Sequence, residues 1–106
     1  MRILGVDPGL ATIGWGVIDV EKGKAKVVSY GIIKTPKEET IPVRLCLIEK
    51  GMKSLIAQFT PDEIALEELF FNTNITTGIN VAHARGVILL TCVKECGKLY
   101  EYTPLQ

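Results

Sequence analysis

Residues 2–9 read Arg-Ile-Leu-Gly-Val-Asp-Pro-Gly, a short apolar run that stops at an acidic residue and a turn. Apolar and β-branched residues at the start of this run favour a strand. Pro8 fixes φ and Gly9 allows the positive φ that other residues avoid, so we expect the chain to turn directly after Asp7. The sequence therefore predicts a first strand over residues 2–7 that ends in a carboxylate.

Two further strand-like segments follow, and a short polar turn joins them. Residues 13–20 and 25–33 are rich in Ile and Val, and the four polar residues between them include a glycine. Such a pattern is typical of an antiparallel hairpin. Glycine lowers strand propensity, so we expect the glycines at 14, 16 and 31 to mark a bulge or a place where another group packs close to the backbone.

The spacing of apolar residues becomes helical at Thr40. From there to Phe59 they recur every three or four positions and form one stripe. Thr40 can cap this helix, and Pro42 is tolerated in its first turn. Thr60 and Pro61 end it. A helix of about 20 residues is long enough to connect two parallel strands.

A second apolar run, residues 62–66, again stops at an acid, Glu67. Residues 70–74 form a loop. The apolar spacing then predicts a second long helix, from Ile75 to Gly97, and glycine is favoured just beyond a helix end. Residues 98–103 supply a fifth strand.

The order strand-strand-strand-helix-strand-helix-strand predicts one α/β domain over residues 1–106. Its mixed sheet would contain three antiparallel strands and then parallel additions through the helices. A chain of this length can form one core without disulfides. No apolar stretch approaches the roughly 20 residues that a membrane span needs. The acid at Asp7 comes too early for a signal peptide, so we expect a soluble cytoplasmic protein with reduced cysteines.

The charge balance limits how the chain could bind a polyanion. There are 12 Lys and Arg residues and 12 Asp and Glu residues, so the formal net charge is +0. General electrostatic attraction to nucleic acid usually requires a basic excess. Any binding of nucleic acid must therefore be local.

The two strand-end acids, Asp7 and Glu67, are the candidate catalytic groups. In open α/β sheets, functional sites gather at the carboxyl ends of strands. If the two strands are neighbours, the carboxylates face one another and repel unless a cation such as Mg²⁺ or Mn²⁺ lies between them. Such a site suits hydrolysis of phosphate esters. Acids at strand ends are also common in structural turns, so the residues alone leave both interpretations open.

Several blocks of the sequence, in this order and at these spacings, resemble the RuvC family of bacterial crossover junction endodeoxyribonucleases. The blocks are Gly5-Val6-Asp7-Pro8-Gly9, Gly14-Trp15-Gly16-Val17, Leu45-Cys46-Leu47-Ile48, Pro61-Asp62-Glu63-Ile64-Ala65-Leu66-Glu67, Phe70 with Asn74, and Ala84-Arg85-Gly86. The resemblance runs from residue 1 to about residue 103.

The resemblance implies an RNase H-like fold in which Asp7 and Glu67 are catalytic and bind Mg²⁺, with Mn²⁺ as a substitute. It implies a homodimer that cleaves four-way (Holliday) junction DNA in recombination and repair, with the RuvA–RuvB branch-migration complex as its protein partner. The family completes the site with an Asp-x-x-Asp pattern on a helix after the fifth strand. The chain ends at Gln106, before that point. We therefore expect a C-terminally truncated fragment, without the last helix, that binds divalent metal weakly and cleaves poorly or not at all.

The resemblance also suggests DNA contacts. Phe70 matches an aromatic residue that stacks on an unpaired base near the junction. Asn72 and Asn74 could contact the DNA backbone, although Asn74 is also a good helix cap. Arg85 could reach a phosphate, although an Arg on a helix surface is usually solvated or paired.

The remaining candidate ligands favour structural roles. His83 flanks the apolar stripe of its helix. Cys92 and Cys96 are four residues apart, which would suit zinc, but no second ligand pair is evident, so reduced thiols are favoured.

Three rival interpretations stay open. Actin-like ATPases and sugar kinases share the glycine-rich opening and bind phosphate, but they are several times longer. YqgF-type RNase H-like proteins share the early acid and would act on RNA. The third possibility is a domain that folds and dimerises without catalysis.

Overall fold

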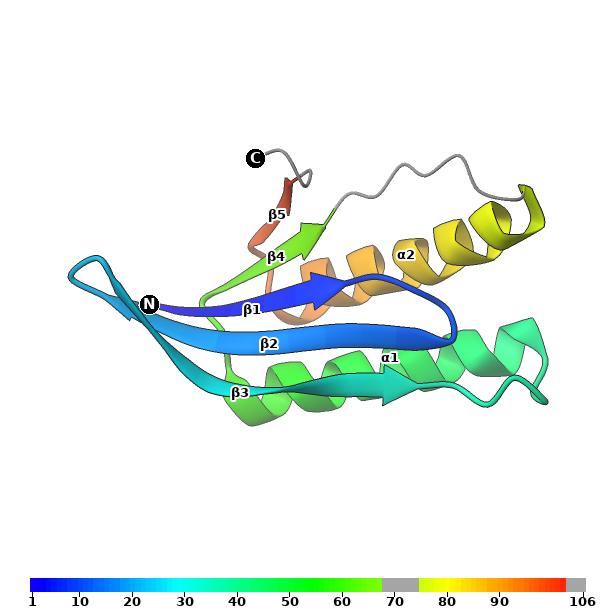
Figure 1. Ribbon diagram of the computed structural model, residues 1–106, viewed down its shortest axis with the longest axis horizontal. Coiled ribbons are helices and arrows are strands. Elements are labelled where there is room, and N and C mark those ends of the chain that lie inside the picture. Colours follow the sequence, from blue (N-terminus) through cyan, green and yellow to red (C-terminus); the bar gives the residue numbers. More distant parts are fainter. Residues whose placement is uncertain (68–74, 103–106) are drawn as a thin grey trace.

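The predicted order of elements is confirmed in the computed structural model, which describes residues 1–67 and 75–102. In these residues there are five strands and two helices (Figure 1). In chain order they are β1 (Arg2–Asp7), β2 (Thr12–Glu21), β3 (Lys24–Lys34), α1 (Ile41–Phe59), β4 (Glu63–Glu67), α2 (Ile75–Glu95) and β5 (Leu99–Tyr102).

The strands form a single mixed sheet in the order β3-β2-β1-β4-β5. The pairs β1/β2 and β2/β3 are antiparallel, and the pairs β1/β4 and β4/β5 are parallel. Both parallel neighbours are reached through helices, as expected for crossover connections. The two helices lie side by side on one face of the sheet, behind the strands in Figure 1. The sheet therefore has a covered face and, in the described part of the chain, a face that no helix covers.

The core lies between the sheet and the helices. Because side chains alternate across a strand, one residue in two on β1 and β4 enters this core. The sheet contributes Leu4, Val6, Ile13, Val17, Ile64 and Leu66, and the helices contribute chiefly Ile48, Met52, Leu55, Ile56, Ala84, Ile88 and Cys92. All of these side chains are buried.

Local signals set the ends of the helices. The Thr40 hydroxyl accepts a hydrogen bond from the backbone N–H of Val43 at 3.4 Å, which confirms it as the cap of α1. Thr60 has a left-handed φ of 42° and ends that helix. Gly97 has a φ of 85°, which a glycine adopts without steric cost, and it follows the end of α2.

The glycines within the strands are not all explained by the same structural feature. The sheet has a bulge between Val17 and Ile18, not at any of the three glycines. Gly31 instead lies under Trp15: a Cβ at Gly31 would be 2.8 Å from the indole Cζ2 atom. The half-buried Trp15 also packs against Phe59, with 5.7 Å between ring centroids. Close packing on the backbone is therefore the correct interpretation for Gly31.

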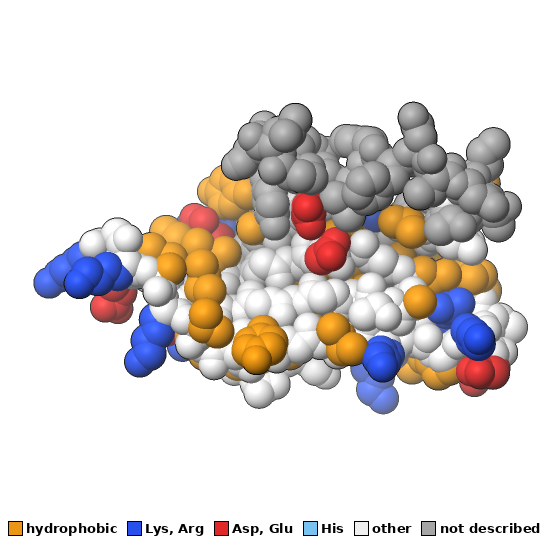
Figure 2. All heavy atoms as spheres, in the orientation of Figure 1, with side chains coloured by type: hydrophobic (Ala, Val, Ile, Leu, Met, Phe, Trp, Pro, Cys, Tyr) orange, Lys and Arg blue, Asp and Glu red, His pale blue; other side chains and the backbone are white. Residues whose placement is uncertain are grey.

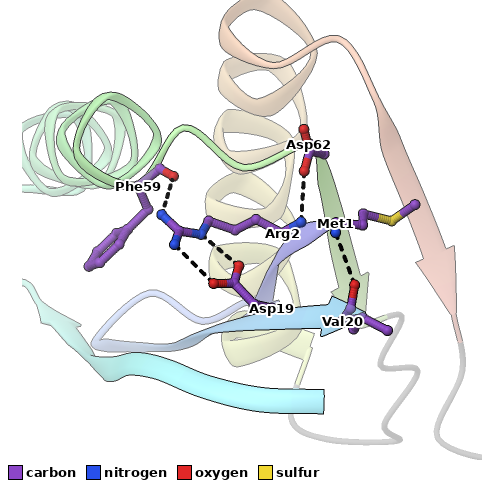
Figure 3. A network of polar contacts seen from close by, with 6 residues as sticks. All are labelled: Met1, Arg2, Asp19, Val20, Phe59 and Asp62. Atoms are coloured by element: carbon purple, nitrogen blue, oxygen red, sulfur yellow. Dashed lines mark hydrogen bonds and ion pairs between the residues drawn. The ribbon is translucent and has the colours of Figure 1, made fainter. Parts of the chain in front are cut away.

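A polar network closes the end of the sheet opposite Asp7 (Figure 3). The Arg2 guanidinium donates to both carboxylate oxygens of Asp19, at 2.8 and 3.0 Å, and to the carbonyl of Phe59 at 3.1 Å. The Arg2 backbone N–H donates to Asp62 at 2.7 Å. These bonds connect β1, β2 and the end of α1.

Neither helix is both long and apolar enough to span a membrane; only the residues that the structure describes were considered.

Candidate active site

Asp7 is the last residue of β1, the central strand. Leu4 and Val6 point into the core, so alternation directs Asp7 to the uncovered face. The side chain is exposed there. On the neighbouring strand it lies opposite Gly14, where a Cβ would be 3.8 Å from the Asp7 Cβ. Asp7 therefore extends over a position that has no side chain.

Glu67 is the last residue of β4 and is half-buried. The parallel register pairs Val6 with Leu66, so Asp7 and Glu67 are the next two positions along neighbouring strands. Such strands are roughly 4.8 Å apart. Leu66 is buried in the core, so Glu67 faces the same way as Asp7. Acidic side chains gather on this face over the ends of β1 and β4 (Figure 2).

Two carboxylates in this arrangement are suited to a hard divalent cation. Their oxygens are the ligands that Mg²⁺ and Mn²⁺ prefer, and a cation between them would offset their repulsion. The described residues contain no group of three or more His, Cys, Asp or Glu side chains placed to hold a metal ion. Two carboxylates alone would leave most positions around an octahedral ion open to water and to phosphate oxygens.

The surface beside the acids is built from small residues, a feature the sequence analysis missed. One row across the sheet pairs Tyr30, Gly16, Gly5, Ala65 and Tyr100 in that order. The two tyrosines are 80% and 56% exposed. The centre of this face shows mainly backbone and small or polar groups (Figure 2). The alternate placement of Gly14 and Gly16 in one strand is the signal that could have revealed it, since both then lie on the same face.

The predicted DNA contacts are placed only in part. Phe70, Asn72 and Asn74 lie outside the described residues. Arg85 lies on α2 and forms an ion pair with Glu101 of β5. Glu101 pairs in register with the buried Leu66, so this ion pair lies on the covered face. Its position supports a structural role for Arg85, and the phosphate contact stays a prediction.

The remaining candidate ligands on α2 do not form a metal site within the described residues. His83 is exposed. Cys92 is buried, and this burial, with a smaller contribution from Cys96, raises the pKa of its thiol to about 12. The structure contains it as a free cysteine. Cys92 is therefore a neutral thiol within the core, as expected.

A comparison with protein families matches residues 3–106 to the family described as crossover junction endodeoxyribonuclease RuvC. Among curated proteins, a similar one is the crossover junction endodeoxyribonuclease RuvC of Finegoldia magna. It is 47% identical over 106 residues, which are 100% of this chain and 65% of that relative. The chain thus spans about two thirds of the relative's length.

Among solved structures, T. thermophilus RuvC in complex with a Holliday junction substrate is similar. Its TM-score is 0.87 and its identity 28%, over 99% of this chain and 66% of that one. The yeast mitochondrial Holliday junction resolvase Ydc2 has a TM-score of 0.73 over 96% of this chain and 52% of its own. At 15% identity, it shows a shared fold only.

Proposed function

The chain belongs to the RuvC family of crossover junction endodeoxyribonucleases, and from this membership we propose that the protein cleaves four-way DNA junctions by metal-dependent hydrolysis of phosphodiester bonds. One observation carries the proposal: Asp7 and Glu67 end neighbouring parallel strands and point to the same uncovered face. A phosphodiester can approach this face because glycines and an alanine line it.

We further propose that Asp7 and Glu67 are the catalytic metal ligands and that the metal is Mg²⁺, with Mn²⁺ as a substitute. When bound, such an ion polarises the phosphate and activates a water molecule. The two carboxylates hold it at the carboxyl ends of β1 and β4. Gly14 leaves room beside Asp7 for a substrate oxygen. With only two carboxylates, we expect the 106 residues alone to bind the ion weakly and to cleave slowly.

A homodimer is part of the proposal, and an apolar stripe on α2 supports it. Ile79, Leu90 and Val93 are 51%, 58% and 52% exposed. Ala82 and Gly86, also exposed, lie between them at helical spacing. A Cβ at Gly86 would meet nothing within 4 Å, so a partner helix could approach closely there. A two-fold dimer suits a junction with two equivalent strands.

The remaining proposals rest on family membership. RuvA–RuvB is proposed as the partner complex of the whole protein. A cytoplasmic location is proposed because the substrate would be chromosomal DNA, and the free cysteines are compatible with it.

The test compares a four-way DNA junction with a linear duplex of the same sequence. We expect tighter binding of the junction and, with Mn²⁺ and excess protein, slow nicking near the crossover. Asp7→Asn should abolish nicking while binding persists, because this change removes a metal ligand and not a DNA contact. A junction composed of RNA is the control for the YqgF-type interpretation. Equal binding of junction and duplex, or a preference for RNA, would refute the proposal.

A further inference from the structure

A pocket lies between the loop that follows β1 and the two helices. Its volume is about 480 Å³. Residues 9–12 form one side, Lys37 comes from the turn before α1, and Arg44 and Asn80 come from α1 and α2. This loop starts directly after Asp7, so the pocket and the acid pair lie at the same end of the sheet. Among the described residues, none of those that line it is acidic.

Arg44 is a buried cation held in a fixed orientation. It is 8% exposed, although it belongs to the apolar side of α1. Its Nε donates to the Thr35 hydroxyl at 2.9 Å, and that hydroxyl donates to the carbonyl of Leu10 at 2.7 Å. Thr35 is itself buried. The guanidinium is thereby fixed against the loop that borders the pocket.

The terminal nitrogens of Arg44 are available to a ligand. Its hydrogen bond within the described residues uses Nε, which leaves Nη1 and Nη2 without a partner there. Neither nitrogen is sealed from solvent, because no fully buried side-chain nitrogen or oxygen in the described chain lacks a partner. A buried charge is costly unless an opposite charge or hydrogen-bond acceptors compensate it. The two nitrogens thus remain accessible to a ligand, on a side chain that lines the pocket.

We propose that this pocket binds a backbone phosphate of the DNA substrate, at a site separate from the acid pair. This inference rests on the proposed function and identifies a second contact for the same strand. A guanidinium donates two parallel hydrogen bonds to a phosphate. Lys37 adds a second positive charge, and Asn80 can donate from its amide. The pocket is a local cationic site of the kind that a chain with no net charge needs in order to bind DNA.

The test measures binding of a four-way DNA junction at several salt concentrations, in Ca²⁺ to prevent cleavage. Lys37→Gln removes one phosphate contact, so we expect roughly 3- to 10-fold weaker binding and a salt slope smaller by about 0.9. Arg44→Lys keeps the charge but loses the paired donors, so affinity should fall while the slope stays the same. Lys50→Gln is the matched control, because Lys50 is exposed on α1 and does not line the pocket.

Thermal melting of each variant establishes whether it folds. If Arg44→Lys does not fold, Lys37→Gln still tests the proposal, because Lys37 is exposed and its substitution leaves the core intact. The inference is overturned if the wild-type chain binds the junction and Lys37→Gln binds it equally well with the same slope. If the wild type binds no DNA, the proposed function fails. An NMR titration with inorganic phosphate and with junction DNA distinguishes a site for small anions from a site for DNA. If phosphate shifts the Arg44 Nε resonance and the DNA does not, the assignment to DNA is overturned.

Discussion

At the scale of single residues, Asp7 and Glu67 are the proposed metal ligands, and their proximity could be predicted. Each directly follows a buried apolar run, and the helix between the runs makes parallel neighbours of the two strands. Arg44 could also have been found, because it lies in the apolar stripe between Ile41 and Ile48 at helical spacing. A charge at such a position needs a partner in the core, and Thr35 supplies one.

The first prediction concerns the metal. Asp7→Asn and Glu67→Gln should each lower the affinity for Mn²⁺ by at least about 10-fold, since even the loss of groups that support a metal ligand commonly costs that much. Isothermal titration calorimetry measures it. Glu63→Gln is the control, because Glu63 lies on the same strand four residues away. Equal Mn²⁺ affinity in all three variants would contradict the assignment.

A second prediction concerns the backbone under Trp15. Gly31→Ala places a Cβ 2.8 Å from the indole, so we expect a loss of about 1–3 kcal/mol in the free energy of unfolding. Gly78→Ala, on α2 with nothing within 4 Å, should instead gain about 0.5–1 kcal/mol. Urea denaturation gives both values. If Gly31→Ala is as stable as the wild type, the close packing described here is incorrect.

The third prediction follows from the pKa of Asp19. The hydrogen bond from Arg2 lowers this pKa, so the folded state favours the charged carboxylate. The resulting stability is present above the ordinary pKa of aspartate and is lost as the pH falls through the lowered value. Wild-type stability should therefore decline more steeply than that of Asp19→Asn between about pH 5 and pH 2. If stability falls with pH equally in the wild type and in Asp19→Asn, the Arg2–Asp19 hydrogen bond makes no such contribution to stability. Glu38→Gln, which removes an exposed carboxylate, is the control.

At the scale of elements, the sequence contains strong local signals. The bounds of α1 follow from Thr40, which caps it, and from Thr60, whose left-handed φ ends it. The position of the bulge in β3, where the pairing with β2 skips Val28, could not be predicted, because it depends on how the two strands pair and not on any single residue. The small residues of the uncovered face were also missed, although Gly14 and Gly16 are two positions apart in one strand and therefore lie on the same face.

A prediction at this scale concerns the exposed stripe on α2. Leu90→Asp places a charge in the proposed dimer interface, so we expect a shift from dimer to monomer. Sedimentation velocity reports the change. Val27→Asp is the matched control, since Val27 is 63% exposed but lies on β3. Two variants with the same oligomeric state would argue against an interface on α2.

At the scale of the whole molecule, the two faces of the sheet have different roles. The helices cover one face and form the core, while the other face presents the acid pair on a surface of small residues. With no net charge, the chain would bind DNA through local cationic groups, as proposed for Lys37 and Arg44 at the end of the sheet where the acid pair lies. Phe70, for which the family resemblance suggests base stacking, lies outside the described residues.

The central claim is that Asp7 and Glu67 share one divalent ion. Crystals grown with millimolar Mn²⁺ and measured for anomalous scattering test this claim most directly. The account predicts a single anomalous peak between the two carboxylates, within about 2.0–2.3 Å of an oxygen from each. A peak elsewhere, with none between Asp7 and Glu67, would contradict it.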